Sequence, residues 1–376
     1  MQYREYGNTG IKLSALGFGC MRFPTDENRR IKEDESIEML KYAYEHGVNI
    51  FDSAAVYNGG DSERVLGKAV KEMDRSRIYI STKNHYKGPD AGEWRRTLEG
   101  SLERLDIDYI DFYHMHDLRL NQFIEGIIVK GGPLQEALKA KEEGLIRHLC
   151  FSSHDDPENV KKMINTGYFE GILVQYNILD RAYEDVIAHA RQKGLGVLVM
   201  GPVGGGRLAA PSEQIQKLIP GGAKTSAEAA LRFVLANENV TTALSGMSSM
   251  QMVVENIETA SRTEPLSEDE KRHMAEMLEQ VRKLAELYCT GCGYCMPCPN
   301  GVDIPANFRA MIYYKVYGLK DYAKSEYRRL KNRKVNGEPK PASADVCVEC
   351  GQCEAKCPQN IPIIKQLKEV AEVLGA

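Results

Sequence analysis

The chain has 376 residues and a formal net charge of -4 with an isoelectric point near 6.1. This length suits one large and one small domain, and the charge gives no reason to expect nucleic acid or an anionic membrane as a partner. No run approaches the roughly 18 apolar residues of a spanning helix, and the first residues lack the apolar core of a secretory signal. We therefore expect a cytoplasmic protein.

Predicted strands and helices alternate along the first two thirds of the chain, after a short hairpin that begins at Tyr3. Apolar runs that predict strands are separated by stretches with helical periodicity. The strands are expected near 15–20, 48–52, 77–83, 109–115, 145–151, 171–175, 196–200 and 241–245. The helices are expected at 33–46, 62–71, 93–104, 133–143, 157–166, 183–193, 226–237 and 250–261.

Eight such alternations favour an α/β fold of the (β/α)8 TIM barrel type over an open sheet. A doubly wound sheet would usually carry G-x-G-x-x-G after its first strand. The glycine cluster of this chain, Gly204–Gly206, follows the seventh predicted strand instead. A long loop is expected from His116 to about Gly132, and loops of that length in compact domains are usually functional.

A capping box at Ser267 and Glu270 predicts a helix that leads toward the cysteine-rich end of the chain. We therefore expect a barrel domain over residues 1–266, a connecting helix over 267–287 and a cysteine-rich domain over 288–376. Between the cysteine groups, residues 308–330 have a helical pattern.

Eight of the ten cysteines form two groups with spacings of two or three residues, which suit metal ligation better than disulfides. The first group is Cys289, Cys292, Cys295 and Cys298, and the second is Cys347, Cys350, Cys353 and Cys357. The second matches the bacterial iron–sulfur run, in which the fourth cysteine usually ligates the other cluster. This favours two [4Fe-4S] clusters, one held by the first three cysteines of the first group with Cys357, the other by the first three of the second group with Cys298. Two zinc sites are the alternative, although zinc ligands usually come as paired knuckles.

Four polar residues follow successive predicted strands: Asp52, Tyr57, Lys83 and His116. A tyrosine with its ordinary pKa near 10 is a poor acid at neutral pH. A lysine ammonium against the phenol would lower the pKa of that phenol, and a carboxylate would keep the lysine charged. A nearby histidine would complete a site that polarises and protonates a carbonyl group.

These residues lie in motifs that resemble the aldo-keto reductases. The motifs are Tyr6–Gly10, Asp52-x4-Tyr57, Ser81–Lys83, Tyr109–His116 and Leu149–Ser153. With the cysteine-rich end, the whole chain resembles aldo-keto reductases fused to a mainly α-helical ferredoxin-like domain. The resemblance implies an NAD(P)-dependent oxidoreductase that acts on a carbonyl compound or its alcohol. Tyr57 would be the general acid, Lys83 and Asp52 would tune it, and His116 would orient the carbonyl, with His114 on the same strand face.

The resemblance also implies nucleotide contacts. Ser152 and Gln175 would meet the nicotinamide carboxamide, Gly204–Gly206 and Arg207 the pyrophosphate, and Ser248, Glu255 and Asn256 the adenosine end. Ser153 and Met200 belong to the same set but replace the Asn and the stacking Tyr that are usual in the family. Gly246 and Met252 replace basic residues that bind a 2′-phosphate in many members, so we favour NAD(H) over NADP(H).

How the two halves cooperate stays open at this point. A nicotinamide transfers two electrons as hydride whereas a cluster passes one, so a direct exchange would need an intermediary such as a flavin. The protein could be a carbonyl reductase with structural or partner-serving clusters, a flavin- or ferredoxin-coupled electron-transfer enzyme, or a non-catalytic redox sensor. A basic run over 315–334 could bind an acidic carrier such as ferredoxin or flavodoxin or could be a solvated helix face.

Overall fold

The computed structural model describes residues 1–209, 212–219, 222–262, 266–286, 289, 293–357 and 360–375. The chain forms two compact units. The barrel unit comprises Met1–Gly206 and Ala230–Pro265, and the cysteine unit comprises Arg207–Ala229 and Leu266–Ala376. Over the described ranges, none of the helices combines the length and the apolar character that a bilayer crossing requires.

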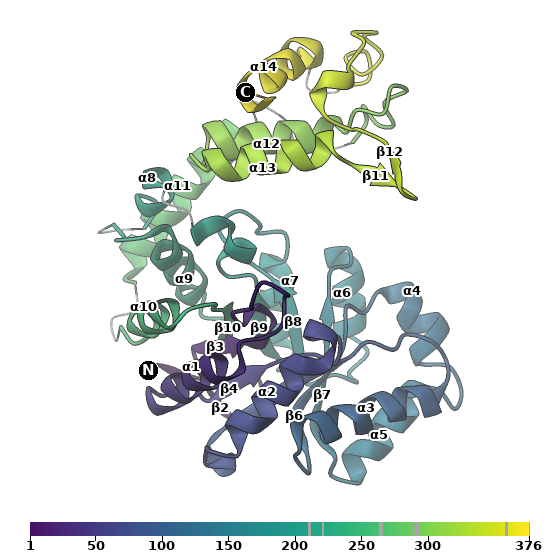
Figure 1. The fold of residues 1–376 in the computed structure, drawn as a ribbon, viewed down its shortest axis with the longest axis vertical. Coiled ribbons are helices and arrows are strands. Elements are labelled where there is room, and N and C mark those ends of the chain that lie inside the picture. The colour runs from purple at the N-terminus through teal and green to yellow at the C-terminus, as the bar shows by residue number, and fades with distance from the viewer. Residues whose placement is uncertain are drawn as a thin grey trace. The chain divides into compact units, whose positions relative to one another are not determined.

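Eight parallel strands close into the predicted barrel (Figure 1). They are β3 (Leu16–Gly19), β4 (Ile50–Asp52), β5 (Tyr79–Asn84), β6 (Ile110–Met115), β7 (Ile146–Ser153), β8 (Gly171–Gln175), β9 (Gly196–Met200) and β10 (Thr242–Gly246). The last strand pairs with the first, through Gly246 and Gly19 among others. Because all strands are parallel, their carboxyl ends meet at one rim of the barrel.

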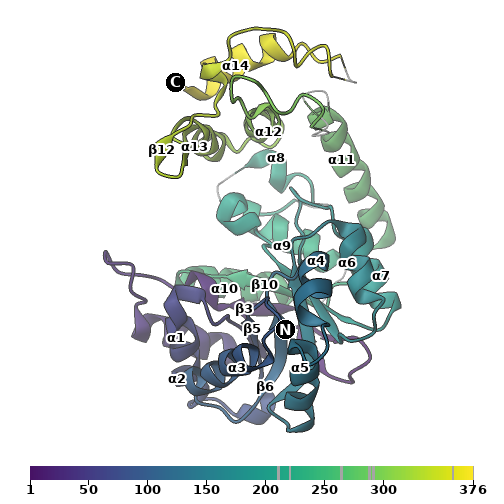
Figure 2. The same cartoon turned by 90° about the vertical axis from the view of Figure 1, so that its right-hand side faces the viewer.

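Helices cover the outside of the barrel, and the pairs α1–α2, α2–α3, α3–α5, α6–α7 and α1–α10 pack side by side (Figure 2). They are α1 (Glu33–Glu45), α2 (Asp61–Val70), α3 (Ala91–Leu105), α5 (Pro133–Glu142), α6 (Pro157–Ile164), α7 (Glu184–Gln192), α9 (Ser226–Ala236) and α10 (Met250–Ala260). Several begin as their sequences predict. For example, Asp90 caps α3 by accepting hydrogen bonds from the backbone of Gly92 and Glu93.

The amino end of the barrel is filled by Tyr6, which lies between the hairpin strands β1 (Tyr3–Glu5) and β2 (Lys12–Ser14). Tyr6 is fully buried and belongs to a core layer with Phe112, Cys150 and apolar residues of other strands. A Cβ added at Gly171 would lie 1.8 Å from the Tyr6 hydroxyl, and one added at Gly196 would lie 2.3 Å from the ring. The two glycines therefore leave the space that this ring occupies.

The cysteine unit is mainly helical, with a small hairpin of strands β11 (Lys334–Val335) and β12 (Glu338–Pro339). Its helices are α8 (Glu213–Gln216), α11 (Glu268–Glu286), α12 (Ile304–Lys315), α13 (Lys320–Lys331) and α14 (Ile363–Gly375). Helices α12, α13 and α14 pack against one another (Figure 2). The predicted capping box is present at the start of α11, where Glu270 N–H donates to Ser267 Oγ at 3.3 Å and Ser267 N–H donates to Glu270 at 2.8 Å.

One expectation about local structure was wrong and another is refined. The segment expected to be one loop from His116 to Gly132 contains α4 (Leu120–Gln122) and a π-helical turn over Phe123–Ile127. Phe123 and Ile127 are buried, which fixes this turn against the barrel. The helical pattern expected over 308–330 is confirmed, but it forms two helices, because Gly318 adopts a φ of 66° and separates them.

Candidate active site and cysteine pocket

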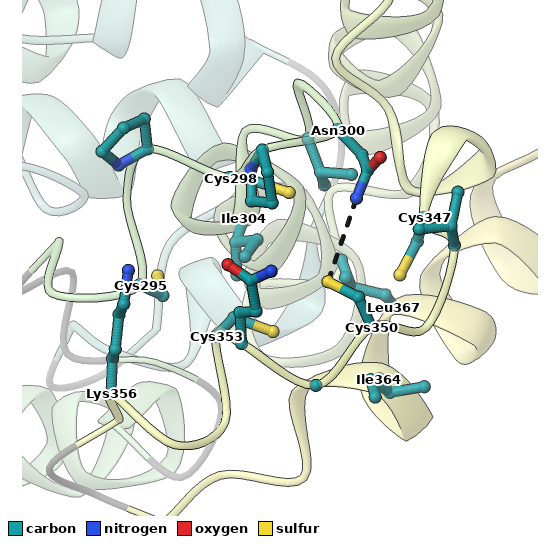
Figure 3. Close-up of a pocket in the computed structure, with 16 residues that line it drawn as sticks. Cys295, Cys298, Asn300, Ile304, Cys347, Cys350, Cys353, Lys356, Ile364 and Leu367 are labelled. Atoms are coloured by element: carbon teal, nitrogen blue, oxygen red, sulfur yellow. Dashed lines mark hydrogen bonds between the residues drawn. The ribbon is translucent and has the colours of Figure 1, made fainter.

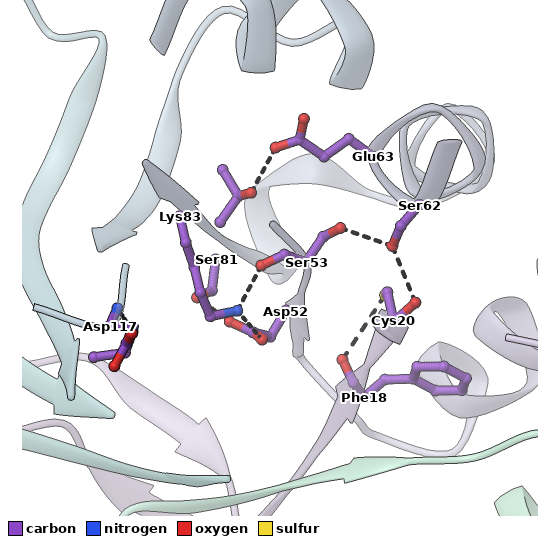
Figure 4. Close-up of polar contacts among 11 residues, drawn as sticks. Phe18, Cys20, Asp52, Ser53, Ser62, Glu63, Ser81, Lys83 and Asp117 are labelled. Atoms are coloured by element: carbon purple, nitrogen blue, oxygen red, sulfur yellow. Dashed lines mark hydrogen bonds and ion pairs between the residues drawn. The ribbon is translucent and has the colours of Figure 1, made fainter. Parts of the chain in front are cut away.

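Asp52 and Lys83 form a buried ion pair inside the carboxyl end of the barrel (Figure 4). Asp52 is the last residue of β4 and pairs in register with Ser81 of β5, so Lys83 lies two residues further on the same face. Lys83 Nζ lies 2.5 Å from Asp52 Oδ1 and donates to the carbonyl oxygen of Ser53 at 2.6 Å. The Ser81 hydroxyl donates to the other carboxylate oxygen of Asp52 at 2.6 Å.

This pairing keeps Lys83 charged although its side chain is buried. Burial alone lowers the pKa of a lysine, but the Asp52 carboxylate and the Tyr57 phenol outweigh it and hold the pKa of Lys83 above its ordinary value. The barrel therefore contains a fixed ammonium group directly below its carboxyl rim.

Tyr57 and His116 lie at the rim above this ion pair. Lys83 Nζ is 4.9 Å from the centre of the Tyr57 ring, and the Tyr57 and His116 rings meet edge to face with centroids 6.0 Å apart. Burial and the positive charges of Lys83 and Lys87 lower the pKa of His116 to about 4. His116 is therefore neutral at physiological pH. The structure brings all four predicted catalytic side chains together.

His114 lies one layer deeper than His116 on β6 and is completely buried. It is in register with Lys83 on β5 and with Cys150 on β7. Burial, and then the Lys83 charge, lower its pKa to about 3. In the described part of the chain, neither ring nitrogen has a well-aligned hydrogen-bond partner. His114 thus shares the barrel interior with the catalytic set but does not reach the rim.

Ser152 and Ser153, at the end of β7, are both buried and hold the following loops. The Ser152 hydroxyl accepts a hydrogen bond from the backbone of Asp117 at 2.9 Å. The Ser153 hydroxyl donates to the carbonyl oxygen of Leu118 at 2.6 Å and accepts from the backbone of Asp155. The Ser153 hydroxyl is therefore already hydrogen-bonded within the chain, both as a donor and as an acceptor.

Gln175 and Met200 end the neighbouring strands β8 and β9, are in register with each other, and are only partly buried. The Gln175 amide donates to Asp180 at 2.7 Å. Gly204, Gly205 and Gly206 follow β9 in a tight turn with φ values of 58°, 66° and 93°. The side chain of Arg207 lies outside the described part of the structure.

The residues expected at the adenosine end surround the start of α10. Ser248 is exposed and contacts Met252, and Glu255 is exposed and accepts a hydrogen bond from Gln251 at 2.8 Å. Asn256 is mostly buried and donates to Ser245 of β10 at 3.1 Å. Together with Gln175, Met200 and the glycine turn, they follow the carboxyl ends of β8, β9 and β10, at the same rim as the catalytic group but separated from β4–β6 by β7 on one side and β3 on the other.

Sequence reasoning missed two features of this rim. Arg22 ends the turn Cys20–Arg22 after β3, and its side chain crosses Gly246 of β10. Lys87 pairs with Asp117 at 3.1 Å beside His116. Both basic residues follow barrel strands in the sequence. This position could have indicated them, because the loops after the strands form the rim where TIM barrels have their active sites.

Five of the predicted cluster ligands line one pocket of the cysteine unit: Cys295, Cys298, Cys347, Cys350 and Cys353. Figure 3 shows the sulfur atoms of Cys298, Cys347, Cys350 and Cys353 turned toward a common space, with Cys295 on the opposite side of the pocket. Asn300 donates toward Cys350 Sγ at 3.9 Å. Four thiols around one space, with an amide donor to one of them, fit the donor set of a [4Fe-4S] cluster.

The other three predicted ligands do not complete a second pocket in the described structure. Cys289 and Cys357 are described but do not line this pocket, and Cys292 lies outside the described residues. Over the residues described, no three His, Cys, Asp or Glu side chains are close enough to share a single metal ion. Cys295 and Cys298 of the first group both line the pocket with Cys347, Cys350 and Cys353, and the predicted division of the cysteines between two clusters stays a prediction.

Comparison with known proteins gives two family matches. The model of the aldo/keto reductase family matches residues 15–279, and the model of a 4Fe-4S dicluster domain matches residues 288–361. The chain is 30% identical to L-galactose dehydrogenase of Arabidopsis thaliana, over 76% of this chain and 96% of that protein. It is 27% identical to the NADH-specific methylglyoxal reductase of Escherichia coli K12, over 74% of this chain and 98% of that protein.

Solved structures agree with these matches. The holo form of the aldo-keto reductase AKR11C1 from Bacillus halodurans matches with a TM-score of 0.64 and 29% identity, over 74% of this chain and 96% of that one. The thermostable aldo-keto reductase Tm1743 matches with a TM-score of 0.61 and 27% identity, again over 74% of this chain.

Proposed function

The chain belongs to the aldo/keto reductase family and carries a 4Fe-4S dicluster domain, and from that premise we propose that its barrel exchanges hydride between a nicotinamide nucleotide and a small aldehyde or ketone, or the corresponding alcohol. The observation that carries the proposal is the buried Lys83–Asp52 pair below the Tyr57 phenol at the carboxyl rim. A phenol beside a buried, fixed positive charge supports a role for Tyr57 as proton donor.

In the proposed reaction, the bound nicotinamide supplies the hydride for the carbonyl carbon. Tyr57 donates its phenol proton to the carbonyl oxygen, and the Lys83 ammonium stabilises the phenolate that remains. Asp52 holds Lys83 in place and balances its charge. In alcohol oxidation the same phenolate takes the proton back, because the forward and reverse reactions share one transition state.

His116 orients the carbonyl in this proposal. Its lowered pKa of about 4 leaves the ring neutral at physiological pH, so it can donate an N–H hydrogen bond without giving up a proton. The edge-to-face contact with Tyr57 sets the direction of the two rings relative to each other. A carbonyl oxygen between them would receive one donor from each side chain.

The nucleotide is proposed to follow the rim from Ser152 and Gln175, past Met200 and the glycine turn, to Ser248, Glu255 and Asn256. A turn of three glycines lets the backbone approach a phosphate closely. The name of the methylglyoxal reductase relative supports NADH and a small carbonyl substrate. The neutral side chain of Met252, proposed to lie at the adenosine end, supports NADH over NADPH. Ser153 acts mainly by positioning the loop that contains Leu118, and Asn256 by tying α10 to strand β10.

The eight cysteines of the 288–376 domain are proposed to hold two [4Fe-4S] clusters, joined to the barrel of residues 1–266 by the helix over 267–287. Cys347, Cys350 and Cys353 share one cluster with Cys298, and Cys289, Cys292 and Cys295 share the other with Cys357. Such clusters pass one electron at a time. They are structural or exchange electrons with a partner, since hydride chemistry in the barrel does not require them.

Electron transfer to a carrier protein is the second candidate function, and one observation favours it. Residues 320–340 contain eight Lys or Arg and three Asp or Glu, a net charge of +5 in a chain of net charge -4. The end of α13 is fixed near the cluster loop, because Tyr327 donates to Asp345 at 2.8 Å and Lys331 pairs with the same carboxylate. Asp345 precedes Cys347 by two residues, so an acidic ferredoxin or flavodoxin would be attracted close to a cluster.

The experiment that separates these functions uses protein purified without oxygen, supplied with NADH or NADPH and a panel of aldehydes and ketones. Turnover without any added carrier supports the carbonyl reductase. Turnover only with flavin or with reduced ferredoxin, at a rate that falls with added salt, supports the electron-transfer enzyme. No turnover under either condition contradicts both and favours a redox sensor.

A further inference from the structure

Arg22 crosses from the first barrel strand to the last. It ends the turn Cys20–Arg22 directly after β3, and β3 pairs with β10 through Gly19 and Gly246. A Cβ added at Gly246 would lie 2.7 Å from Arg22 Cγ and 3.0 Å from Arg22 Cβ. Among the described residues other than Ser245, Gly246 and Met247, the next nearest atom is the carbonyl oxygen of Gly19, at 3.8 Å. Because Gly246 has no side chain, it leaves the space that the Cβ and Cγ atoms of Arg22 occupy.

The guanidinium of Arg22 reaches the glycine turn after β9. Its Nη2 atom would lie 3.7 Å from a Cβ added at Gly205, which adopts a φ of 66°. Arg22 is exposed, and within the described ranges no residue forms a hydrogen bond or an ion pair with its guanidinium. The barrel rim thus presents a positive charge without a counter-charge beside a turn that carries no side chains.

We propose that Arg22 binds the pyrophosphate of the nicotinamide dinucleotide, against the turn Gly204–Gly206; this rests on the proposed function of the barrel. Arginine donates two parallel hydrogen bonds to a phosphate, and the glycines let the backbone approach the same group. Gly246 at the end of β10 has no basic side chain. The positive charge comes instead from Arg22, which follows the paired strand β3. Because NADH and NADPH share the pyrophosphate, Arg22 strengthens the binding of both to a similar degree.

The test measures binding rather than turnover. Dissociation constants of NADH, NADPH and ADP-ribose are measured by calorimetry on the full, cluster-loaded protein and on Arg22→Met, which keeps an apolar stem. We expect each dissociation constant to rise about tenfold, as the loss of a charge-assisted phosphate contact implies, and its dependence on salt to weaken. Arg77→Met, an exposed arginine before the amino end of β5, is the matched control and leaves all three values unchanged.

Gly246→Ala provides an independent variant. Its new methyl group must displace the Arg22 stem. We therefore expect it to raise the dissociation constants of all three ligands when Arg22 is present, and to cause no further rise in the Arg22→Met background. Thermal melting of each variant checks that the barrel remains folded.

The outcomes separate the inference from its premise. If wild-type protein binds none of the three ligands, the proposed function of the barrel is wrong. If wild-type protein binds them and Arg22→Met binds them equally well, the inference alone is wrong. A loss confined to NADPH would contradict the assignment to the pyrophosphate and place Arg22 at the 2′-phosphate. Inorganic phosphate is titrated alongside the three ligands, and an Arg22→Met variant that loses affinity for inorganic phosphate but not for ADP-ribose would show a free-anion site and contradict the inference.

Discussion

Two histidines of the same strand lie in different surroundings. His114 is fully buried beside Lys83 and has a pKa lowered to about 3 by burial, whereas His116 reaches the rim and has a pKa of about 4. Because an unfolded histidine titrates near 6.5, each folded side chain binds fewer protons than its unfolded form at acidic pH. The contribution of each to stability is therefore complete above about pH 6.5 and is lost as the pH falls toward its folded value.

His114→Leu should remove part of this acid sensitivity. Between pH 7.5 and pH 5, we expect the free energy of unfolding of the wild-type barrel to fall by about 2 kcal/mol more than that of the variant. The single tryptophan, Trp94, is buried in the barrel unit and reports its unfolding by urea. His273→Gln, which changes an exposed histidine, should follow the wild type. Equal pH slopes for wild type and His114→Leu would contradict the assignment.

His116 should not titrate in the working range of the enzyme. With its pKa at about 4, the kcat/KM for carbonyl reduction should show no acid limb from His116 between pH 5.5 and pH 8. His116→Gln keeps an N–H donor and should retain more activity than His116→Ala over that range. An acid limb near pH 6.5 that disappears in His116→Gln would show a charged His116 and contradict the neutral-donor role.

At the scale of elements, the hairpin before β3 closes the amino end of the barrel through one tyrosine. The ring of Tyr6 fills space that side chains at Gly171 and Gly196 would need, and its hydroxyl lies 3.3 Å from Cys150 Sγ. Packed interiors resist added volume because neighbouring side chains cannot all shift. The two glycines and the hairpin are therefore one packing unit, although they are far apart in the sequence.

Gly171→Ala should destabilise the barrel by about 1–3 kcal/mol, the usual cost of overpacking. Adding Tyr6→Phe removes the hydroxyl that the new methyl group meets and should recover part of that loss. Urea denaturation followed by Trp94 fluorescence measures both. Gly92→Ala, at an exposed position in the first turn of α3, serves as the control and should not destabilise the barrel, because alanine favours a helix more than glycine does. Lack of any recovery in the double variant would argue against the contact.

The sequence predicted elements better than it predicted contacts. Periodicity and glycine positions located all eight strands, and parallel pairing then brought Asp52, Lys83 and His116 to one rim. The contact between Arg22 and Gly246 was not predictable, because it depends on closure of the barrel between its first and last strands. The break between α12 and α13 depends on the backbone of Gly318, which a helical pattern of side chains does not report.

For the whole molecule, the question is whether one cluster is bound by cysteines of both groups, because such a cluster would link the two segments. Cys298 belongs to the first group in sequence but faces Cys347, Cys350 and Cys353 in the pocket (Figure 3). A cluster held by both groups would tie together segments some fifty residues apart in the chain. Loss of one cluster would therefore loosen both loops.

Cys298→Ser and Cys353→Ser should remove the same cluster. Protein prepared without oxygen should contain about eight iron and eight sulfide per chain, and each single variant should lose about half, with the same electron paramagnetic resonance signal missing. The double variant should lose no more than either single one. Cys20→Ser, a buried cysteine of the barrel, should retain the full content. Loss of both signals in the double variant would place Cys298 on the other cluster.

The proton donor at the barrel rim is the centre of this account, and Tyr57→Phe tests it most directly. Under anaerobic conditions with saturating NADH and an aldehyde that the wild type reduces, we expect kcat to fall by about 10²- to 10⁴-fold, as for loss of a general acid, while the dissociation constant of NADH stays within about twofold. The result that would contradict the account is a Tyr57→Phe variant that reduces the aldehyde at the wild-type rate.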